Sequence, residues 1–408
     1  MNKVQSPTAG SHSSPVTRHS SPQFRALPPL SLYIHIPWCV RKCPYCDFNS
    51  HEARGALAEE RYVAALISDL EQALPDVWGR SVYTIFFGGG TPSLLSAQAI
   101  DSILGAVRAR LSLAVDAEIT LEANPGTVEA EKFRDFRAAG VNRLSIGIQS
   151  FDPRHLKALG RIHDDEEARR AIELAREHFD NFNLDLMYAL PGQSVAEARA
   201  DIERALAWQP PHLSAYHLTI EPNTTFHRFP PRLPDDDMAA QMQDAVEDAL
   251  CSEGYRHYET SAFARPGKQS RHNLNYWTFG DYLGIGAGAH SKLSFLGRVE
   301  RTMRIKHPER YMAGAERGAA VQERHEVAVA EIGFEFMMNA LRLTEGFAVR
   351  LFEERVGVPM TAVLERLEAA ERRGLIERDP ARVRPTPLGR RFLNDLLQMF
   401  LPDKTPES

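Results

Sequence analysis

Six short apolar segments alternate with longer segments whose apolar residues recur at helical spacing, and this alternation restricts the possible folds more than any other feature. The apolar segments are residues 32–36, 82–87, 118–122, 143–148, 183–188 and 212–218. Between them, helices are expected at residues 62–74, 97–111, 129–139, 165–178 and 195–208. Repeated strand–helix units form parallel sheets with right-handed crossovers. The chain is therefore predicted to be an α/β protein, either a six-stranded open barrel or a doubly wound sheet.

The alternation ends near residue 222, and the chain beyond it has two parts. Residues 235–254 predict one helix and residues 255–260 a strand, before a Gly-rich stretch at 283–290 that indicates turns near something requiring small residues. From about residue 326 the pattern changes. Helices are expected at 328–341, 348–356 and 360–373, then a Pro-broken hairpin at 379–387 and a last helix at 388–400. Helices followed by a hairpin indicate a winged-helix-like module.

The first 30 residues differ in composition from the rest. They contain six serines, five prolines and no acidic residue, which predicts a disordered tail. An organelle transit peptide is also Ser- and Arg-rich and poor in acids, but these prolines interrupt any amphipathic helix. The expected organisation is a tail (1–30), a barrel core (31–222), a core extension (223–325), a C-terminal domain (326–400) and a second disordered tail (401–408).

Composition argues against several classes of partner. The net charge is −6, and residues 361–400 hold eight arginines against six acidic residues, so no basic surface for nucleic acid is expected. No apolar run approaches the roughly 18 residues of a transmembrane segment. Three of the four cysteines fall within eight residues, unlike a disulfide framework, which predicts a reducing, cytoplasmic location. The fourth, Cys251, is expected to be a buried helical residue.

The three clustered cysteines indicate a metal centre. Cys39-Val40-Arg41-Lys42-Cys43-Pro44-Tyr45-Cys46 directly follows the first predicted strand. A 4Fe-4S cluster takes one thiolate per iron, so three cysteines would leave one iron open for chemistry. Structural zinc is the alternative, because His51 could complete a Cys₃His set.

Polar residues stand at the ends of successive predicted strands. Glu122, Gln149 and Asp185 lie at or near carboxyl ends, which is where barrel enzymes place ligand-binding residues, and this favours the barrel over the doubly wound sheet. Arg161 could clamp a carboxylate. The run Gly88-Gly89-Gly90-Thr91-Pro92-Ser93 follows the second strand and allows backbone to approach a ligand closely. Each residue alone could equally be a solvated strand end, and the glycines a tight turn.

The cysteine spacing after Leu32-Tyr33-Ile34-His35-Ile36-Pro37, taken with the glycine run, resembles the radical S-adenosylmethionine (SAM) superfamily. The resemblance implies a partial (β/α)₆ barrel with a 4Fe-4S cluster on Cys39, Cys43 and Cys46. SAM would be an exchangeable ligand of the open iron through its amine and carboxylate. Electron transfer from the cluster could then cleave SAM to a 5′-deoxyadenosyl radical.

From about residue 31 to the C-terminus the chain resembles the oxygen-independent coproporphyrinogen III oxidase group. The resemblance rests on Leu121-Glu122-Ala123-Asn124-Pro125, Ser145-Ile146-Gly147-Ile148-Gln149-Ser150-Phe151, Leu159-Gly160-Arg161 and Asp185-Leu186-Met187. The SAM contacts that it implies fall on Tyr33, Tyr45, Gly89, Gly90, Thr91, Glu122, Gln149, Arg161 and Asp185. No catalytic residue is assigned.

Within this group the sequence is similar to the haem chaperone branch. The oxidases carry a further cysteine two places after the third cluster ligand, where this chain has Phe48, and they have a longer ordered N-terminal segment. The run His272-Asn273-Leu274-Asn275-Tyr276-Trp277 matches the H-N-x-x-Y-W signature of the chaperone branch. His272 is the implied haem contact, since imidazole can ligate haem iron and the flanking aromatics can pack on a porphyrin. The alternative is a buried His–Asn pair with an aromatic core.

Two functions are therefore carried forward. The first is a haem chaperone that binds haem, a 4Fe-4S cluster and SAM and passes haem to an unidentified acceptor protein, with a separate electron donor. The second is a radical SAM oxidoreductase that decarboxylates coproporphyrinogen III. The missing cysteine at Phe48 favours a chaperone without oxidase activity.

Overall fold

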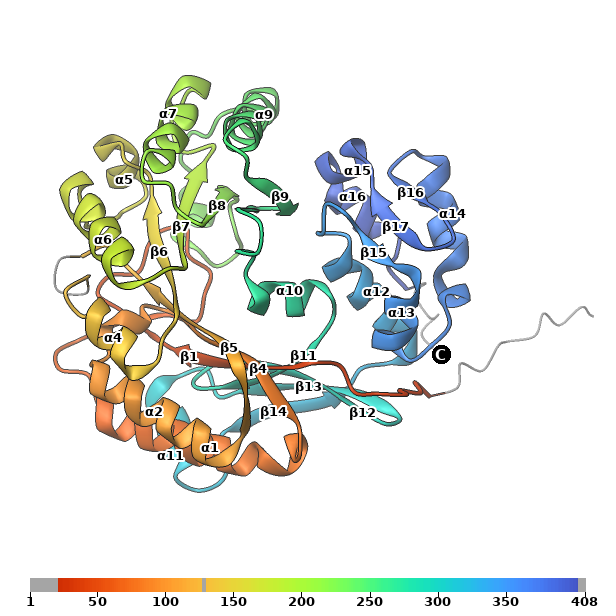
Figure 1. Ribbon diagram of the computed structural model, residues 1–408, viewed down its shortest axis with the longest axis horizontal. Helices are drawn as coiled ribbons and strands as arrows, with labels where there is room; N and C mark the ends of the chain where they lie inside the picture. The colour runs from red at the N-terminus through yellow and green to blue at the C-terminus, as the bar shows by residue number, and fades with distance from the viewer. Residues whose placement is uncertain (1–20, 127–129, 403–408) are drawn as a thin grey trace, which may run out of the picture.

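The protein, a computed structural model, is described for residues 21–126 and 130–402 (Figure 1). The predictions for residues 1–20 and 403–408 lie outside the described residues. Six parallel strands pair in chain order, and these are β1 (Leu30–Ile36), β4 (Ser81–Gly89), β5 (Ser112–Ala123), β6 (Arg143–Gln149), β7 (Phe182–Tyr188) and β8 (His212–His217). They correspond to the six apolar segments, so the predicted α/β class with a parallel sheet is confirmed.

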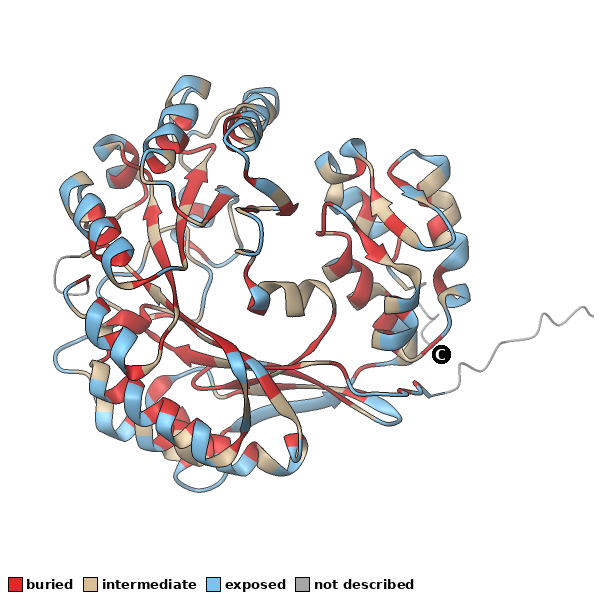
Figure 2. Cartoon of the chain, viewed as in Figure 1, coloured by how far each residue is buried: buried red, intermediate tan, exposed pale blue. Residues whose placement is uncertain are grey.

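The helices that follow these strands cover the outer face of a curved sheet (Figure 1). They are α1 (Glu59–Val77), α2 (Ala97–Arg110), α4 (Phe133–Ala139), α5 (Pro153–Ala158), α6 (Asp165–His178), α7 (Val195–Leu206) and α9 (Asp236–Ser252). Asp164 and Ser194 begin α6 and α7 with reciprocal capping boxes to Glu167 and Glu197. Helix faces toward the strands are buried and the outward faces are exposed (Figure 2). This one-sided cover agrees with the open barrel and not with a doubly wound sheet.

The sheet has twelve strands and continues beyond the barrel at both edges. One edge adds β10 (Ala262–Ala264) and β9 (Arg256–Glu259). The other adds β11 (Asp281–Ile285), which runs parallel to β1, and the antiparallel β12 (His290–Phe295), β13 (Arg298–Arg304) and β14 (Val321–Glu326).

The predicted turn-rich segment at 283–290 is therefore wrong for its first half. Leu283 and Ile285 pair with Leu32 and Ile34 of β1 inside the sheet. Gly284 is needed for a close approach and not for a turn, because a Cβ there would lie 2.0 Å from the carbonyl oxygen of His290 on the neighbouring strand.

Two buried ion pairs fix the added strands. Arg304 Nε lies 3.1 Å from Asp69 of α1, and Lys292 Nζ lies 3.0 Å from Asp281 at the start of β11. Asp69 also accepts hydrogen bonds from Tyr311 and from the backbone of Gly286. Buried charges with these additional hydrogen bonds favour one arrangement of the β11–β13 segment against the barrel.

The C-terminal domain has its own apolar core, in which Phe336 meets Phe347 and Phe352 edge-on. Its elements are α12 (Val329–Ala340), β15 (Phe347–Ala348), α13 (Val349–Val356), η2 (Met360–Val363), α14 (Leu364–Arg372), β16 (Ile376–Arg378), β17 (Arg382–Pro385), α15 (Pro387–Arg391) and α16 (Leu393–Gln398). β17 is central in a three-stranded antiparallel sheet. This agrees with the expected helices and hairpin of a winged-helix-like module.

Part of the predicted N-terminal tail packs against the C-terminal domain. Phe24 is 7% exposed and belongs to the C-terminal core, and the backbone of Gln23 donates to Gly357 at 2.9 Å. The composition of the segment could not predict this contact, because a single phenylalanine and a few backbone hydrogen bonds hold the segment in place. Cys251 lies on α9 as predicted, but it is exposed and not buried.

The remaining elements are short. They are β2 (Trp38–Cys39), β3 (His51–Glu52), η1 (Pro92–Leu94), α8 (Thr225–Arg228), α10 (Arg271–Trp277) and α11 (Pro308–Ala315). Helix α10 lies between the barrel and the C-terminal domain (Figure 1). None of the helices in the described ranges is long and apolar enough to cross a membrane.

Candidate cluster and ligand site

The three clustered cysteines lie on a closed loop beyond the carboxyl end of β1. Strand β2 pairs with β3 in parallel, so residues 39–52 fold back on themselves. The His51 backbone donates to Pro37 at 2.7 Å, and Ala53 donates to Cys39 at 2.9 Å. All three thiols are free and partly exposed. The loop thus presents them together at the ligand-binding edge of the barrel.

The surroundings of these thiols fit an iron–sulfur cluster. Arg161 Nη1 donates to Cys43 Sγ at 3.8 Å, and Ser50 Oγ lies 3.8 Å from Cys46 Sγ. Burial raises the pKa of the Cys39 and Cys46 thiols. Iron binds thiolates, and these would be stabilised in the site by nearby hydrogen-bond donors and by the positive charge of the metal.

The zinc alternative would need a compact donor set. Zinc–sulfur distances of about 2.3 Å bring ligand sulfurs to roughly 4 Å from one another. Among the described residues, only Asp152, His155 and Glu197 form a group of three metal-ligand side chains with donor atoms within 4.8 Å of one another. The three cysteines and His51 therefore form no preformed compact set of the kind that zinc takes.

The glycine run brings the ends of β1 and β4 into direct contact. Gly90 and Thr91 donate backbone hydrogen bonds to Ile36 and Trp38, both at 2.7 Å. A Cβ on Gly90 would lie 2.5 Å from the Trp38 carbonyl oxygen, and one on Gly89, whose φ is +109°, would lie 2.4 Å from the His35 ring. Only glycine allows this approach, which places the loop at residues 88–91 against the cysteine loop.

Two carboxyl groups face the barrel interior. Glu122 accepts from the Gly89 backbone at 3.3 Å, and burial, reinforced by the negative Asp185, raises the pKa of Glu122 to about 8. Asp185 accepts from Ser145 Oγ and Asn183 Nδ2, each at 2.8 Å, and burial raises its pKa as well. In the part of the chain that the structure describes, no basic side chain forms a salt bridge with Glu122. Such a group suits a ligand that supplies hydrogen-bond donors.

Arg161 joins the cysteines to the strand ends through an unpredicted residue, Asn124. Arg161 Nη2 donates to Asn124 Oδ1 and to the Gly147 carbonyl, both at 2.7 Å, and Asn124 Nδ2 donates to Thr91 Oγ1 at 2.9 Å. Gln149 sits at a strand bulge with a φ of +64°, its amide beside Gly147. Asn124 lies two residues after Glu122 and directly beyond the end of β5, so the alternation of side chains along a strand, continued by one residue, could have revealed it.

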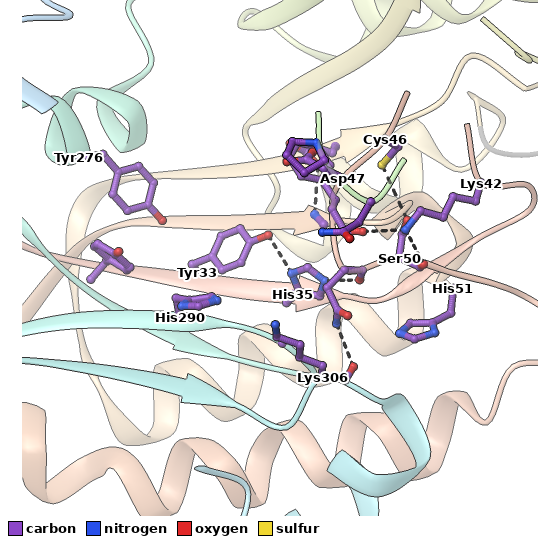
Figure 3. Close-up of a pocket in the computed structure, with 18 residues that line it drawn as sticks. Tyr33, His35, Lys42, Cys46, Asp47, Ser50, His51, Tyr276, His290 and Lys306 are labelled. Atoms are coloured by element: carbon purple, nitrogen blue, oxygen red, sulfur yellow. Dashed lines mark hydrogen bonds between the residues drawn. The ribbon is translucent and has the colours of Figure 1, made fainter. Parts of the chain in front are cut away.

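A cavity of about 710 Å³ opens beside the cysteine loop (Figure 3). Of the residues predicted to contact SAM, Tyr33, Gly89 and Glu122 line it, together with Cys46. A second cavity of about 100 Å³ is lined by Cys43 and Arg161. Gln149 and Asp185 line neither of these two cavities.

Tyr45 and Tyr33 occupy different surroundings. Tyr45 packs among apolar residues, with its ring centroid 6.3 Å from that of Phe226. Tyr33 OH lies 3.0 Å from His35 Nδ1, and His35 Nε2 lies 2.9 Å from the Asn49 carbonyl oxygen. Burial lowers the pKa of His35 to about 4, so this imidazole is neutral at pH 7.

His272 lies inside the protein on α10. It is 1% exposed, with Nδ1 2.8 Å from Thr84 Oγ1 and Nε2 3.1 Å from Tyr276 OH. Burial lowers the pKa of His272 to about 3. Both ring nitrogens thus have protein partners. To ligate iron the ring would have to break one of these hydrogen bonds and turn out of its site.

The two aromatic residues of the same motif point to different places. Tyr276 lines the large cavity and points into it (Figure 3). The Trp277 ring instead stacks under Arg342, whose guanidinium carbon lies 4.3 Å from the ring centroid. This segment therefore reaches the cavity through Tyr276 and the C-terminal domain through Trp277.

Two family models match the chain. Residues 33–205 match the radical SAM superfamily, and residues 327–392 match the HemN C-terminal domain. The heme chaperone HemW of Escherichia coli K12 is 50% identical over 377 residues, which cover 92% of this chain and 99% of that protein. The heme chaperone HemW of Bacillus subtilis is 35% identical, over 91% of this chain and 99% of that protein.

A solved structure shares the whole architecture. The coproporphyrinogen III oxidase HemN of Escherichia coli, a radical SAM enzyme, superposes with a TM-score of 0.78 over 92% of this chain and 90% of the oxidase. Sequence identity is 24%, so this likeness concerns the fold.

Proposed function

The chain belongs to the HemW family of radical SAM proteins, and from that premise we propose that it is a haem chaperone that binds haem, a 4Fe-4S cluster and SAM and passes haem to an acceptor protein. The observation that carries the proposal is the match to chaperones over 99% of their length together with a 710 Å³ cavity beside the cysteine loop. Its volume lies within the range of about 300–1,000 Å³ typical of small-molecule sites.

The residues that would hold the cluster and SAM are those of the barrel edge. Cys39, Cys43 and Cys46 would ligate three irons, and the cluster would supply an open iron and an electron. Arg161 supports Cys43 through its 3.8 Å contact and is itself held by Asn124. Glu122 would accept hydrogen bonds from SAM inside the cavity. Gln149, Asp185, Thr91, Gly90 and Tyr45 are proposed SAM residues that do not line the cavity.

Transfer of haem requires partners and an environment that keeps thiols reduced. We place the protein in the cytoplasm because three free, partly exposed cysteines stand together. The C-terminal domain is our proposed docking surface for the haem acceptor, since its charges are mixed and the predicted cluster and SAM residues lie in the barrel. An electron donor is required for cluster reduction.

The proposal is tested by haem titration. The full chain, reconstituted anaerobically with iron and sulfide, should bind haem with a distinct visible spectrum, and the loaded protein should lose it to an added apo-haem protein. A reconstituted chain whose absorption is only that of free haem would contradict the proposal.

The oxidase alternative makes the opposite prediction. Phe48 replaces the further cysteine of the oxidases and is 61% exposed at the cavity. The chain is therefore expected not to convert coproporphyrinogen III to protoporphyrinogen IX under anaerobic reducing conditions with SAM. Formation of protoporphyrinogen IX at the rate of a true oxidase, measured by product analysis, would overturn the chaperone assignment.

A further inference from the structure

We propose that His290 is a ligand of the haem iron and that haem lies in the part of the cavity lined by Tyr276, Tyr282 and His290, next to the part lined by the proposed SAM residues. This inference rests on the proposed haem-binding function and specifies its site. His290 begins β12, lines the 710 Å³ cavity and is exposed. Figure 3 shows its ring near Tyr33, with Cys46 on the opposite side of the cavity.

The choice among histidines follows from which ring is both exposed and without a hydrogen-bond partner. Three histidines line the cavity, namely His35, His51 and His290. Both nitrogens of His35 have hydrogen-bond partners. His51 Nε2 also has no hydrogen-bond partner, but this nitrogen is buried, and the ring packs on His307 with centroids 5.6 Å apart. The His290 ring has no hydrogen-bond partner among the described residues, so it can offer a lone pair to iron without breaking a contact.

The backbone that carries His290 is held rigidly. Gly288 has a φ of +80° and stands where a Cβ would lie 2.3 Å from Asn49 Nδ2. Two residues after His290, Lys292 is buried in its ion pair with Asp281. A ligand supported by fixed backbone loses little freedom on binding, which favours iron coordination.

The cavity lining mixes aromatic rings with polar side chains such as Asn49, Ser50 and Glu122. Tyr276 and Tyr282 line it together with His290, and Phe48 lies exposed at its margin. Lys306 lines the same cavity with an exposed side chain that forms no salt bridge in the described part of the protein. Aromatic rings can pack on the porphyrin, and the Lys306 ammonium can pair with a propionate. An exposed single ligand also leaves a face from which haem can be released.

One side chain connects the cysteine loop to this site. Asn49 Nδ2 donates to the carbonyl oxygens of Ala287 and Lys306, both at 2.9 Å. The backbone carbonyl oxygen of Asn49 lies 2.9 Å from His35 Nε2. The loop that would hold the cluster therefore also holds the turn before His290, so the two sites are mechanically linked.

The test compares haem titrations of the full, reconstituted chain and its variants. We expect His290→Ala to lose the histidine-ligated absorption spectrum and to bind haem at least tenfold more weakly, and added imidazole to restore the spectrum. His272→Ala should keep the histidine-ligated spectrum. His325→Ala is the matched control, because His325 is an exposed histidine on β14 of the same sheet and does not line the cavity.

Two outcomes would overturn the proposal, and neither is a failure of haem binding itself. A His290→Ala variant with the wild-type spectrum and affinity would place the iron ligand elsewhere. If the alanine variant did not fold, His290→Met should bind haem with an altered spectrum, and an unaltered one would equally refute the role of His290. Absence of haem binding by the wild type would instead refute the proposed function, before any variant is compared.

Discussion

The two sides of the large cavity are built in opposite ways. The cysteine side consists of one short loop, in which three thiols within eight consecutive residues declare their chemistry. The facing side is assembled from α10, β11, β12 and the residues after β13, and its lining side chains, Tyr276, Tyr282, His290 and Lys306, are spread over 31 residues without a compact spacing. The difference teaches that metal ligands with a short, regular spacing can be predicted from the sequence. A histidine that can bind a metal only because its ring has no hydrogen-bond partner in the fold cannot be predicted in this way.

His272 and His290 show this contrast within one residue type. The first is 1% exposed with both nitrogens hydrogen-bonded, and the second is exposed with no hydrogen-bond partner in the described ranges. The motif around His272 is conspicuous in the sequence. In the structure this motif holds Tyr276 at the cavity, and His272 positions Tyr276 through their hydrogen bond.

The largest expected effect concerns the cysteine side. Replacing Cys39, Cys43 or Cys46 by Ala should abolish cluster assembly, because each would remove one of only three protein thiolates. Iron and sulfide content and visible absorption after anaerobic reconstitution measure it. Cys251→Ala is the control, since this exposed thiol on α9 lies outside the site. Stoichiometric zinc with no cluster in the wild type would refute the cluster assignment.

The next effect distinguishes the two histidines by acid stability. Burial lowers the pKa of His272 to about 3 from an unfolded value near 6.5, so its neutral form stabilises the fold fully above pH 6.5. That contribution is lost as the pH falls from 6.5 toward 3, by about 3 kcal/mol at about pH 4.5.

His272→Gln should therefore flatten the decline of unfolding free energy between about pH 6.5 and 4.5, whatever its effect at neutral pH. Denaturant unfolding at several pH values measures this slope. His290→Gln is the matched control and should retain the wild-type slope more closely. Equal slopes for His272→Gln and the wild type would show that His272 is not the buried neutral group that the structure indicates.

A smaller effect tests the link between the two sides. Asn49→Ala removes two hydrogen bonds, to Ala287 and Lys306, and should cost about 2 kcal/mol of unfolding free energy at about 1 kcal/mol each. Asn49→Asp should cost more, because a carboxylate would face both carbonyl oxygens. Iron content should stay at the wild-type level in Asn49→Ala while haem affinity falls. Unchanged haem affinity would show that the two sides are independent.

The smallest effect concerns Glu122. Because its pKa is raised to about 8, the carboxyl group is mostly protonated at pH 7 and must lose its proton before both oxygens can accept hydrogen bonds from SAM with the strength of a charged group. SAM affinity should rise up to about tenfold per pH unit below pH 8 and level off above it. Glu122→Gln should remove this pH dependence and leave the cluster spectrum intact. Calorimetric titration would measure the SAM affinity of variant and wild type at each pH. The same pH profile in both proteins would refute the role of Glu122 in SAM binding.

The barrel and the C-terminal domain could be predicted because their elements carry clear apolar periodicity. The predicted segment 82–87 lies within β4, and the helix expected at 328–341 appears as α12 (Val329–Ala340). Strands β13 and β14 could not be predicted in this way. Their sequences, RVERTMR and VQERHE, are mostly charged or polar, and every residue of β14 is exposed. These last two strands on one side of the sheet form because neighbouring strands offer backbone partners and not because of apolar alternation.

By itself, the sequence determined the parallel α/β core, the cysteine set and the strand-end acids, because periodicity and ligand spacing are local properties. Tertiary structure alone decided that Phe24 enters the C-terminal core, that Asn124 joins Arg161 to Thr91, and which cavity histidine is both exposed and without a hydrogen-bond partner. Burial and hydrogen-bond partners depend on residues far apart in the chain. His272 lies 188 residues from Thr84, its partner, and no local pattern encodes that contact.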